Sequence, residues 1–380
     1  MAFMADVRRK RTRIYMIFLV AMIFFILSMG GCEKEGNSQN LPGKDKPSSA
    51  GAKENIVLSL KVAEGRFFSA FDWINNNVFV YVTESGEGAS VFAYDLKKGE
   101  SRLLHKSEAP IVSVTASPSR KYLFIHSSPS ANLATATVID TEGKEIFSEQ
   151  IPSMDMTVEW NPYNERYMVL AAFSETWDYS GYLLDLQKKS LTEIDLPQPF
   201  VYWVDEQEVL FIDWNFSDIE HFAPLKKYRF ADGASELVMD DVYYADVLGD
   251  DGFVILLVRE NTHATYSFYT QKLEKIRSFR IPQLSNFSAW LIPYYDYVED
   301  GKSFLTFQPL RSGEADLYDE KFQLVSYPLE GNGEGKIILD QAENEPLSCS
   351  PDGKFCLYGF YMENLLNVQT KEIIPLLEQE

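Results

Sequence analysis

Residues 67–107 read FFSAFDWINNNVFVYVTESGEGASVFAYDLKKGESRLLHKS, and this stretch decides the fold. It contains four short runs rich in aromatic and β-branched residues: FFSAFDW, VFVYVTE, SVFAYDL and SRLLHKS. Short segments containing Asn or Gly separate the first three runs from one another and from the fourth. Such residues supply the backbone angles of tight turns, so the stretch predicts four consecutive β-strands.

The same pattern returns along the chain. The next copies read IVSVTASP, KYLFIHSS, TATVID, EIFSEQIP and then MTVEWNP, RYMVLAAF, GYLLDL, SLTEIDL. Asp95, Asp140 and Asp185 close the third run of each copy and are 45 residues apart, and Asp232 continues the series. We interpret them as turn residues rather than acid catalysts, because Asp side chains bond their own downstream backbone. Seven copies begin near residues 67, 111, 155, 199, 242, 289 and 346.

A repeat of about 40–45 residues with four strands per unit is typical of a β-propeller. Several such sheets packed radially cover one another's faces and leave only short edges. The sequence therefore predicts an all-β fold, a single β-propeller of seven four-stranded blades. Six blades remain an alternative, because Ile56–Val62 forms an extra strand that could pair with the last blade and let both termini share it.

The N-terminus predicts export and lipid attachment. Five basic residues lie between Arg8 and Arg13, and the uncharged, mostly apolar run Ile14–Met29 leads to Gly30, Gly31 and Cys32. Sixteen residues are short for a transmembrane helix, the main alternative, and fit a signal peptide better. Small residues before a cysteine look like a bacterial lipobox. We predict a lipoprotein signal peptide at 1–31, a lipidated Cys32 with a disordered linker at 32–54, and a propeller domain at 55–380.

Composition narrows the possible partners and the location. The chain has a formal net charge of −21. Nucleic acids attract Lys and Arg, so a nucleic-acid partner is not expected. Anionic lipid surfaces also attract basic residues, so the body should not lie flat on one. We expect the lipid on Cys32 to hold the protein at the cell membrane, with its body on the extracytoplasmic face.

A family resemblance follows from these features. The turn Ser350–Lys354, SPDGK, looks like the turn of TolB-type periplasmic propellers. The lipobox, the polar spacer and a single propeller together resemble the YqgU-like lipoproteins of Gram-positive bacteria. That resemblance implies a membrane location and a propeller described as six-bladed. It provides no catalytic residues to transfer.

Signals for catalysis, metals and cofactors are missing from the sequence. The four histidines are scattered, and none has metal-ligand spacing. A Gly-x-Ser-x-Gly nucleophile motif and a phosphate-binding glycine loop are also missing. We therefore expect a protein without a cofactor or a metal that is not an enzyme. Cys349 and Cys356 are expected to be buried, unpaired thiols, with a disulfide between adjacent strands as the alternative.

Two loops rich in aromatic and acidic residues are the candidate site. Residues 174–181 and 214–222 both join the second and third strands of their copies, so neighbouring blades should present them on one face. The candidate ligand-binding residues are Trp177, Asp178, Tyr179, Trp214 and His221. Aromatic platforms beside carboxylates suit peptides, sugars or cations. The alternative is that these aromatics pack on one another and cap the blades.

Three hypotheses about function follow. The first is a scaffold that binds a protein or peptide partner, since a propeller offers a broad, rigid disc. The second is a carbohydrate- or cell-wall-binding module that uses the aromatic loops. The third is a glycan-acting enzyme, which would require Glu175 or Asp178 to face a second carboxylate across a cleft. The fold alone does not choose among them.

Overall fold

The computed structural model describes residues 60–86, 88–215, 222–249, 251–260, 262–285, 291–331 and 333–377. The chain divides into two units, 1–53 and 54–380, and all of the described residues belong to the second. The predicted signal peptide, Cys32 and the linker lie outside the described residues. A helix long and apolar enough to cross a lipid bilayer is absent from the described part of the chain.

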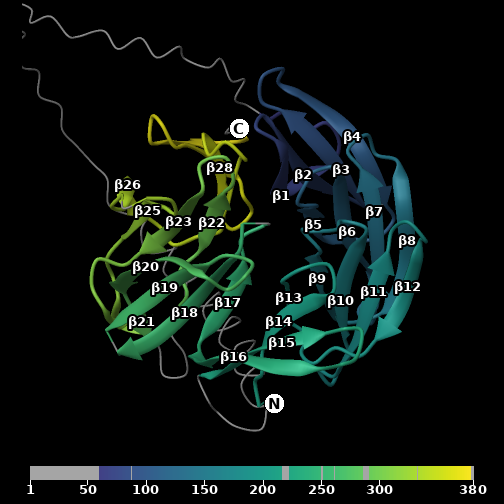
Figure 1. Cartoon of the computed structure of the whole chain (residues 1–380). Coiled ribbons are helices and arrows are strands. Elements are labelled where there is room, and N and C mark those ends of the chain that lie inside the picture. Colours follow the sequence, from purple (N-terminus) through teal and green to yellow (C-terminus); the bar gives the residue numbers. More distant parts are fainter. Residues whose placement is uncertain are drawn as a thin grey trace, which may run out of the picture. The chain divides into compact units, whose positions relative to one another are not determined.

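The second unit is built from seven antiparallel sheets of four consecutive strands (Figure 1). The first three blades are β1 (Arg66–Asn75), β2 (Val78–Ser85), β3 (Gly88–Asp95), β4 (Glu100–Ser107); β5 (Ile111–Ala116), β6 (Tyr122–Ser130), β7 (Leu133–Asp140), β8 (Glu145–Pro152); and β9 (Asp155–Trp160), β10 (Tyr167–Phe173), β11 (Tyr179–Asp185), β12 (Ser190–Ile194). The fourth and fifth are β13 (Tyr202–Trp203), β14 (Glu208–Ile212), β15 (Ala223–Arg229), β16 (Ser235–Val242); and β17 (Tyr244–Val247), β18 (Phe253–Glu260), β19 (His263–Tyr269), β20 (Lys275–Pro282).

The last two blades complete the ring. They are β22 (Tyr295–Val298), β23 (Ser303–Gln308), β25 (Phe322–Pro328), β26 (Lys336–Ala342); and β27 (Leu347–Cys349), β28 (Phe355–Tyr358), β29 (Asn364–Asn367), β30 (Glu372–Pro375). The sixth blade carries an insertion with the 3-10 helix η1 (Ala315–Leu317) and with β24 (Gly313–Glu314), which pairs in parallel with β21 (Leu284–Ser285). The prediction of seven blades is confirmed, and the six-bladed alternative is wrong for this chain.

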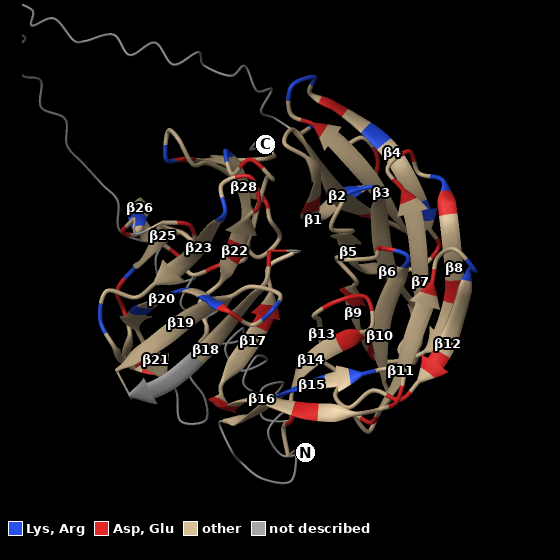
Figure 2. Cartoon of the chain, in the orientation of Figure 1, with Lys and Arg blue, Asp and Glu red and all other residues tan. Residues whose placement is uncertain are grey.

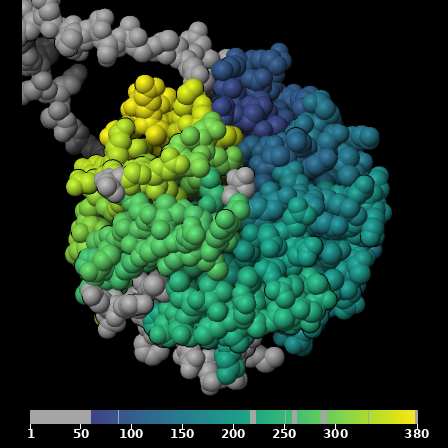
Figure 3. Space-filling view, viewed as in Figure 1, coloured from purple at the N-terminus to yellow at the C-terminus, as the bar shows by residue number. Residues whose placement is uncertain are grey.

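The hydrophobic core is divided among the blade interfaces. The described residues form seven apolar clusters, and each cluster joins two neighbouring blades. In β2, Phe79 and Tyr81 pack toward the seventh blade, whereas Val80 and Val82 pack toward the second. Because both faces of each sheet are covered, the second strands read as continuous apolar runs rather than alternating ones. Figure 3 shows the blades as consecutive sectors of colour.

Charged residues lie mainly on the outermost strands and the connections (Figure 2). The outermost strand β4, for example, is mostly exposed or half-buried, whereas the middle residues of β2 and β3 are buried. Each blade thus presents its fourth strand to solvent as an edge. Charged side chains on such an edge oppose pairing with another sheet.

The ring closes between the first and seventh blades. The backbone N–H of Leu60 donates to the carbonyl of Leu376 at 2.7 Å, and both side chains are buried in the cluster that joins these blades. The indole Nε1–H of Trp73 donates to the carbonyl of Ser348 at 2.9 Å. Residues 60–62 are the described part of the extra strand expected at 56–62, and they do not form a strand. Leu60 still reaches the last blade, which has four strands of its own.

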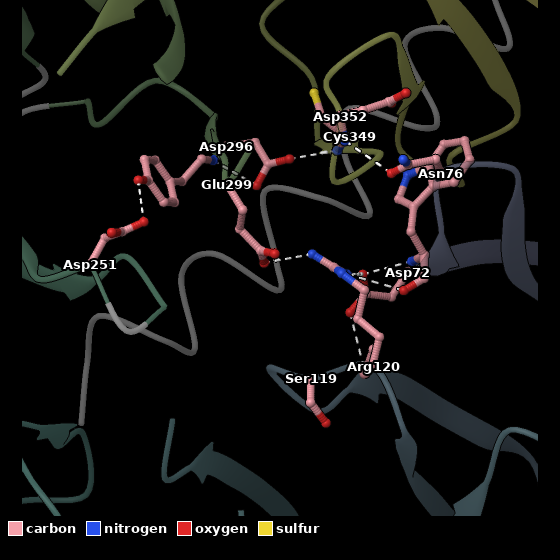
Figure 4. A network of polar contacts seen from close by, with 12 residues as sticks. Asp72, Asn76, Ser119, Arg120, Asp251, Asp296, Glu299, Cys349 and Asp352 are labelled. Atoms are coloured by element: carbon pink, nitrogen blue, oxygen red, sulfur yellow. Dashed lines mark hydrogen bonds and ion pairs between the residues drawn. The ribbon is translucent and has the colours of Figure 1, made fainter. Parts of the chain in front are cut away.

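Aspartates on the innermost strands join one blade to the next. Asp72 Oδ2 accepts the N–H of Ala116 at 2.9 Å, and Asp296 Oδ2 accepts the N–H of Cys349 at 2.5 Å (Figure 4). Each of these N–H groups belongs to the last residue of the following blade's first strand. The Arg120 guanidinium bridges further, donating to Glu299 Oε1 at 2.7 Å and to the carbonyl of Trp73 at 3.1 Å.

Cys349 and Cys356 form a disulfide bond, so the expectation of unpaired thiols is wrong. They lie directly opposite each other on β27 and β28, with Cα atoms 3.8 Å apart. The N–H of Ser350 donates to the carbonyl of Phe355, which makes the cysteine pair one of the closely spaced, non-hydrogen-bonded positions of the ladder. That register was not readable from the sequence.

The turn aspartates behave as predicted. Oδ1 of Asp95, Asp140 and Asp185 each accepts two backbone N–H groups from the residues that follow. Asp232 accepts the N–H of Ala234. The turn at Ser350–Lys354 is also present, with Gly353 at a φ of +65°, a conformation that favours glycine.

Candidate functional site

Successive connections of each four-stranded meander lie at opposite ends of the strands, so the propeller has two different faces. The loop face is formed by the connections between second and third strands and between blades, whose described residues are 86, 108–110, 131–132, 153–154, 174–178, 195–201, 213–215, 222, 243, 262, 283–285, 291–294, 309–321, 343–346 and 359–363. The turn face is formed by the other connections, whose described residues are 76–77, 96–99, 117–121, 141–144, 161–166, 186–189, 204–207, 230–234, 248–249, 251–252, 270–274, 299–302, 329–331, 333–335, 350–354 and 368–371.

Hydrogen bonds connect neighbouring segments within each face. On the loop face, Asn132 donates to the carboxylate of Glu175. On the turn face, Asn164 donates to Glu206 at 3.2 Å. These contacts join the loops of the second and third blades on one face and the turns of the third and fourth blades on the other.

Exposed apolar side chains are distributed unequally between the faces. Fourteen large hydrophobic residues among those described are exposed. Five lie singly on the outermost strands, and none lies in a described turn-face connection. The other nine lie in loop-face connections or, for Val112, at the start of the strand beside one: Val112, Met154, Trp177, Phe200, Tyr294, Leu310, Leu317, Phe360 and Tyr361.

Trp177 is the exposed end of an aromatic shelf between the third and fourth blades. Its ring contacts Phe173 with centroids 5.9 Å apart, and Phe173 also contacts Tyr179 and Phe200 at 6.3 Å. Trp177 is 44% exposed and Phe200 is 56% exposed, whereas Phe173 is buried beneath them. The aromatic rings of this cluster therefore pack against one another, and two of them are also exposed to solvent. The buried ring of Phe173 supports the exposed rings of Trp177 and Phe200.

The other candidate residues are placed differently. Asp178 accepts the hydroxyl of Thr176 at 2.7 Å, and the Tyr179 hydroxyl donates to the carbonyl of Leu196 at 3.0 Å. Trp214 is half-buried against the apolar cluster of the fourth and fifth blades, and Gln198 donates to its carbonyl at 3.2 Å. His221 lies outside the described residues.

Two pockets open along the inner strands. One, of about 320 Å³, is lined by residues of β9 and by 199–202, including Glu159, Phe200 and Tyr202. It therefore extends the Trp177 shelf toward the inner strands. The second, of about 490 Å³, lies between β17 and β22 and includes Asp246 and the exposed Tyr294.

The inner wall holds carboxyl and phenol groups that sequence reasoning missed. Asp246 Oδ2 accepts the hydroxyls of Tyr295 and of Tyr244, the latter at 3.2 Å, and the two phenols are 2.5 Å apart. Burial raises the pKa of Asp246, although the tyrosine donors partly oppose the rise. Burial and then the Asp246 charge raise the pKa of Glu159 well above its ordinary value. These groups lie on β9, β17 and β22, which the packing of the blades brings together, so no sequence motif marks them.

Metal ligation finds no support among the described residues. No group of three or more His, Cys, Asp or Glu side chains there is arranged to hold a metal ion. His105 and His126 are partly or fully buried, and burial lowers the pKa of each. The Trp177 shelf and the two pockets therefore offer apolar surface, hydrogen-bonding groups and carboxylates, through which another molecule could bind.

Comparison with known proteins identifies the family. Residues 95–359, more than half of the chain, match the family described as the YqgU-like 6-bladed beta propeller domain. The chain belongs to the YqgU-like family. The matched residues include the second to sixth blades complete, with β4 from the first blade and β27 and β28 from the seventh. This YqgU-like chain has seven blades, so the family's description understates its count by one.

Individual relatives support the family assignment and the fold. The chain is 24% identical over 359 residues to the uncharacterized lipoprotein YqgU of Bacillus subtilis (strain 168), covering 94% of this chain and 96% of that protein. The crystal structure of the uncharacterized protein lmo1340 from Listeria monocytogenes EGD-e matches with a TM-score of 0.77 and 18% identity, covering 86% of this chain and 98% of that one.

A more distant propeller matches as well. The β-propeller domain of the Trilobed protease from Pyrococcus furiosus matches with a TM-score of 0.54 and 13% identity, covering 82% of this chain and 98% of that one. That domain is described as having an open velcro topology. At such identities the two solved structures show the fold alone, and they confirm the predicted propeller.

Proposed function

We propose that this YqgU-like protein is a lipoprotein, anchored through lipid on Cys32 to the extracytoplasmic face of the cell membrane, whose propeller binds a protein or peptide partner. The anchor is supported by the N-terminal sequence and by the lipoprotein among its relatives. The proposal assigns binding to the propeller and no catalytic step.

One observation carries the binding role: nine of the fourteen exposed large apolar residues lie on the loop face or beside it, and none lies on the described turn face. Exposed hydrophobic residues scattered singly need no explanation, but neighbouring ones such as Phe360 with Tyr361, or Trp177 with Phe200, mark an interaction site. Phe360 is 62% exposed and Tyr361 is 58% exposed, and Trp177 and Phe200 lie on the same face. Aromatic residues are enriched at protein interfaces because they bury a large area and lose little side-chain entropy.

Cross-linking from defined positions tests the proposed function. A photo-cross-linking amino acid is placed at Trp177 or Phe360 in the full chain, expressed in the cells that produce it. Leu237, which is 57% exposed on the outermost strand β16, is the matched control position. We expect a discrete adduct with another protein from the first two positions and none from the control. No adduct at the loop face, an adduct only with a second copy of the chain, or equal adducts from Leu237 would contradict the proposal.

The anchor is tested in the same cells with Cys32→Ser. Without the thiol no lipid can be attached, so the chain should lose its resistance to extraction from the membrane by salt and high pH. A signal peptide that is not cleaved can still hold the chain in the membrane. The mass of the protein is therefore measured as well, to show whether the signal peptide has been removed. A wild-type protein that carries no diacylglycerol would contradict the anchor without affecting the binding role.

A second candidate function is carbohydrate binding at the Trp177 shelf. An exposed indole supported by Phe173, with the Asp178 carboxylate on the next residue, is an arrangement that suits a sugar ring. Titration with soluble peptidoglycan fragments tests it. Heat of binding that is lost in Trp177→Ala would support it, and no heat of binding would exclude it.

A further inference from the structure

Charge separates the two faces as clearly as hydrophobicity does. The described turn-face connections contain twelve acidic and twelve basic residues, so that face is balanced. The described loop-face connections contain two basic residues, Arg311 and Lys321, against twelve acidic ones: Glu108, Glu175, Asp178, Asp195, Asp213, Glu314, Asp316, Asp319, Glu320, Glu343, Glu345 and Glu363. The surface that carries the exposed apolar residues is therefore also strongly acidic.

The two basic residues of the loop face already have acidic partners. Arg311 Nε donates to Glu320 at 2.6 Å, and its guanidinium lies 3.6 Å from Asp319. The ammonium group of Lys321 pairs with Glu343. Lys226 of β15 also pairs with Asp213 at 2.6 Å. The other eight acidic residues of this face have no ion pair within 4 Å among the described residues, so most of the acidic charge is left for groups outside the chain.

Glu345 and Glu363 are two neighbouring carboxylates of this acidic surface. Glu345 lies in the connection between the sixth and seventh blades, and Glu363 lies in a loop of the seventh blade. The N–H of Gly359 donates to the carbonyl of Pro346 at 3.1 Å, and the Glu363 carboxylate lies against Gly359, so Glu363 is close to the residue that follows Glu345. Burial raises the pKa of Glu345 and the charge of Glu363 raises it further, whereas the charge of Lys321 opposes the rise. Among the described residues, no ion pair within 4 Å joins either carboxylate to a lysine or arginine. Glu363 accepts the N–H of Tyr361 at 2.9 Å, which places this carboxylate beside the exposed Phe360 and Tyr361.

Two like charges close together destabilise each other, and a cation between them removes that cost. A lysine or arginine also interacts favourably with aromatic faces through the cation–π attraction. Complementary charge at an interface steers association and selects among partners. An anionic lipid surface would instead be repelled by this face.

We infer that the partner docks on the loop face through a polypeptide segment that is both basic and apolar, with a lysine or arginine at Glu345 and Glu363 and an apolar side chain against Phe360 and Tyr361. This inference rests on the proposed function and specifies the chemistry of its partner.

Peptide binding to the full chain in uncharged phosphatidylcholine nanodiscs tests the inference, with empty discs as the blank. Three fluorescent peptides of equal length are compared, with alternating Lys and Phe, Glu and Phe, or Lys and Ser. We expect the Lys–Phe peptide to bind most tightly, because it alone matches both properties of the face. Equal binding of the Glu–Phe peptide would overturn the basic character of the partner, and equal binding of the Lys–Ser peptide would overturn the apolar part.

Matched charge variants locate the site. Glu345→Gln with Glu363→Gln should raise the Kd for the Lys–Phe peptide by about two- to thirty-fold, the range expected for the loss of two partly exposed ion pairs. Glu274→Gln with Glu334→Gln removes the same charge from exposed turn-face positions and should change Kd less than about twofold. Urea unfolding of both variants verifies that they are folded. An equal effect of both pairs would overturn the assigned site.

The outcomes separate this inference from the proposed function. If Trp177 and Phe360 cross-link to a protein but the Lys–Phe peptide does not bind, the partner chemistry is wrong and the docking face remains. If neither cross-linking nor peptide binding occurs, both fall.

Discussion

Aspartate has two opposite uses in this molecule, and the surroundings of each carboxylate decide between them. Asp185 ends the third strand of its blade, where Arg166 donates two hydrogen bonds of 2.6 Å to its two oxygens. These bonds, chiefly, lower the pKa of Asp185 to about 2. Asp296 accepts only backbone N–H groups, from Tyr297 and Cys349, and burial raises its pKa to about 7. The same residue type thus stabilises a turn in one place and joins two blades in another.

Asp296→Asn should change how stability depends on pH. Because the folded state binds the Asp296 proton more tightly than the unfolded chain does, this carboxyl favours folding below pH 4, and the contribution disappears as pH rises to about 7. The free energy of unfolding of Asp296→Asn minus that of the wild type should therefore increase by up to roughly 4 kcal/mol from pH 4 to pH 7.5. Urea unfolding at several pH values measures it, and a difference independent of pH would contradict the argument.

Asp185→Asn serves as the contrasting variant. Its lowered pKa means that Asp185 favours folding above pH 4, and that this contribution is lost as pH falls toward 2. The stability that the wild type has over Asp185→Asn should therefore shrink on acidification, which is the opposite sign to Asp296. Parallel profiles for the two variants would show that other groups dominate.

Among the elements, the hairpin of β27 and β28 shows how a short strand pair is held in a ring. β27 has three residues and β28 has four, so few ladder hydrogen bonds fix it. The Cys349–Cys356 disulfide and the contact from Asp296 add to those few bonds at the same residue. Longer pairs such as β6 and β7 need no such link, because they share a longer ladder.

Replacing both cysteines, Cys349→Ser with Cys356→Ser, should lower the free energy of unfolding by about 2 kcal/mol. The bond joins residues seven positions apart, and this figure is the chain-entropy cost of closing so short a loop in the unfolded state. Urea unfolding measures the lost stability. Hydrogen exchange should become faster first in β27 and at the indole N–H of Trp73, which donates to the carbonyl of Ser348 in that strand. Wild type treated with a reductant is the control for the substitutions, and no loss in either case would contradict the role of the bond.

At the scale of the whole molecule, stability depends on seven similar interfaces, one of which joins the two ends of the chain. The other six join blades that are neighbours in sequence. The seventh joins Leu60 and the first blade to Phe355, Leu357 and Leu376 at the other end. Closure also places the innermost strands around a common centre, which is how Glu159 comes under the influence of Asp246.

Leu60→Ala should test closure directly. Leu60 is 3% exposed, and truncating a buried leucine costs about 2–5 kcal/mol through lost burial and the cavity left behind. Leu237→Ala, at an exposed position of β16, should cost less than about 0.5 kcal/mol. Urea unfolding compares the two. Equal stability of both variants would show that the segment at residue 60 does not hold the ring.

The repeat made much of the fold predictable. The period of 45 residues, the four runs per copy and the turn residues between them predicted seven blades, because local strand and turn preferences repeat in each copy. The turn roles of Asp95, Asp140 and Asp185 were predictable for the same reason, since an Asp side chain and its downstream backbone are close in sequence.

The candidate site was only partly predictable. The sequence indicated the loop at Trp177, and the structure places its ring on an exposed shelf with Phe200, a residue with no local signal. Trp214 is half-buried in an apolar cluster instead. The disulfide was predicted wrongly because the strand register, which sets the Cα distance, is not written in the spacing of the two cysteines.

The sequence by itself determined the strands, the turns, the number of blades and the predicted lipid anchor, all of which depend on neighbours along the chain. Tertiary structure alone decided the rest: which apolar side chains of the loop face are exposed, that Cys349 lies opposite Cys356, and that Glu159 comes under the influence of Asp246. These properties depend on strand register and on the packing of blades, which the spacing of residues along the chain does not give.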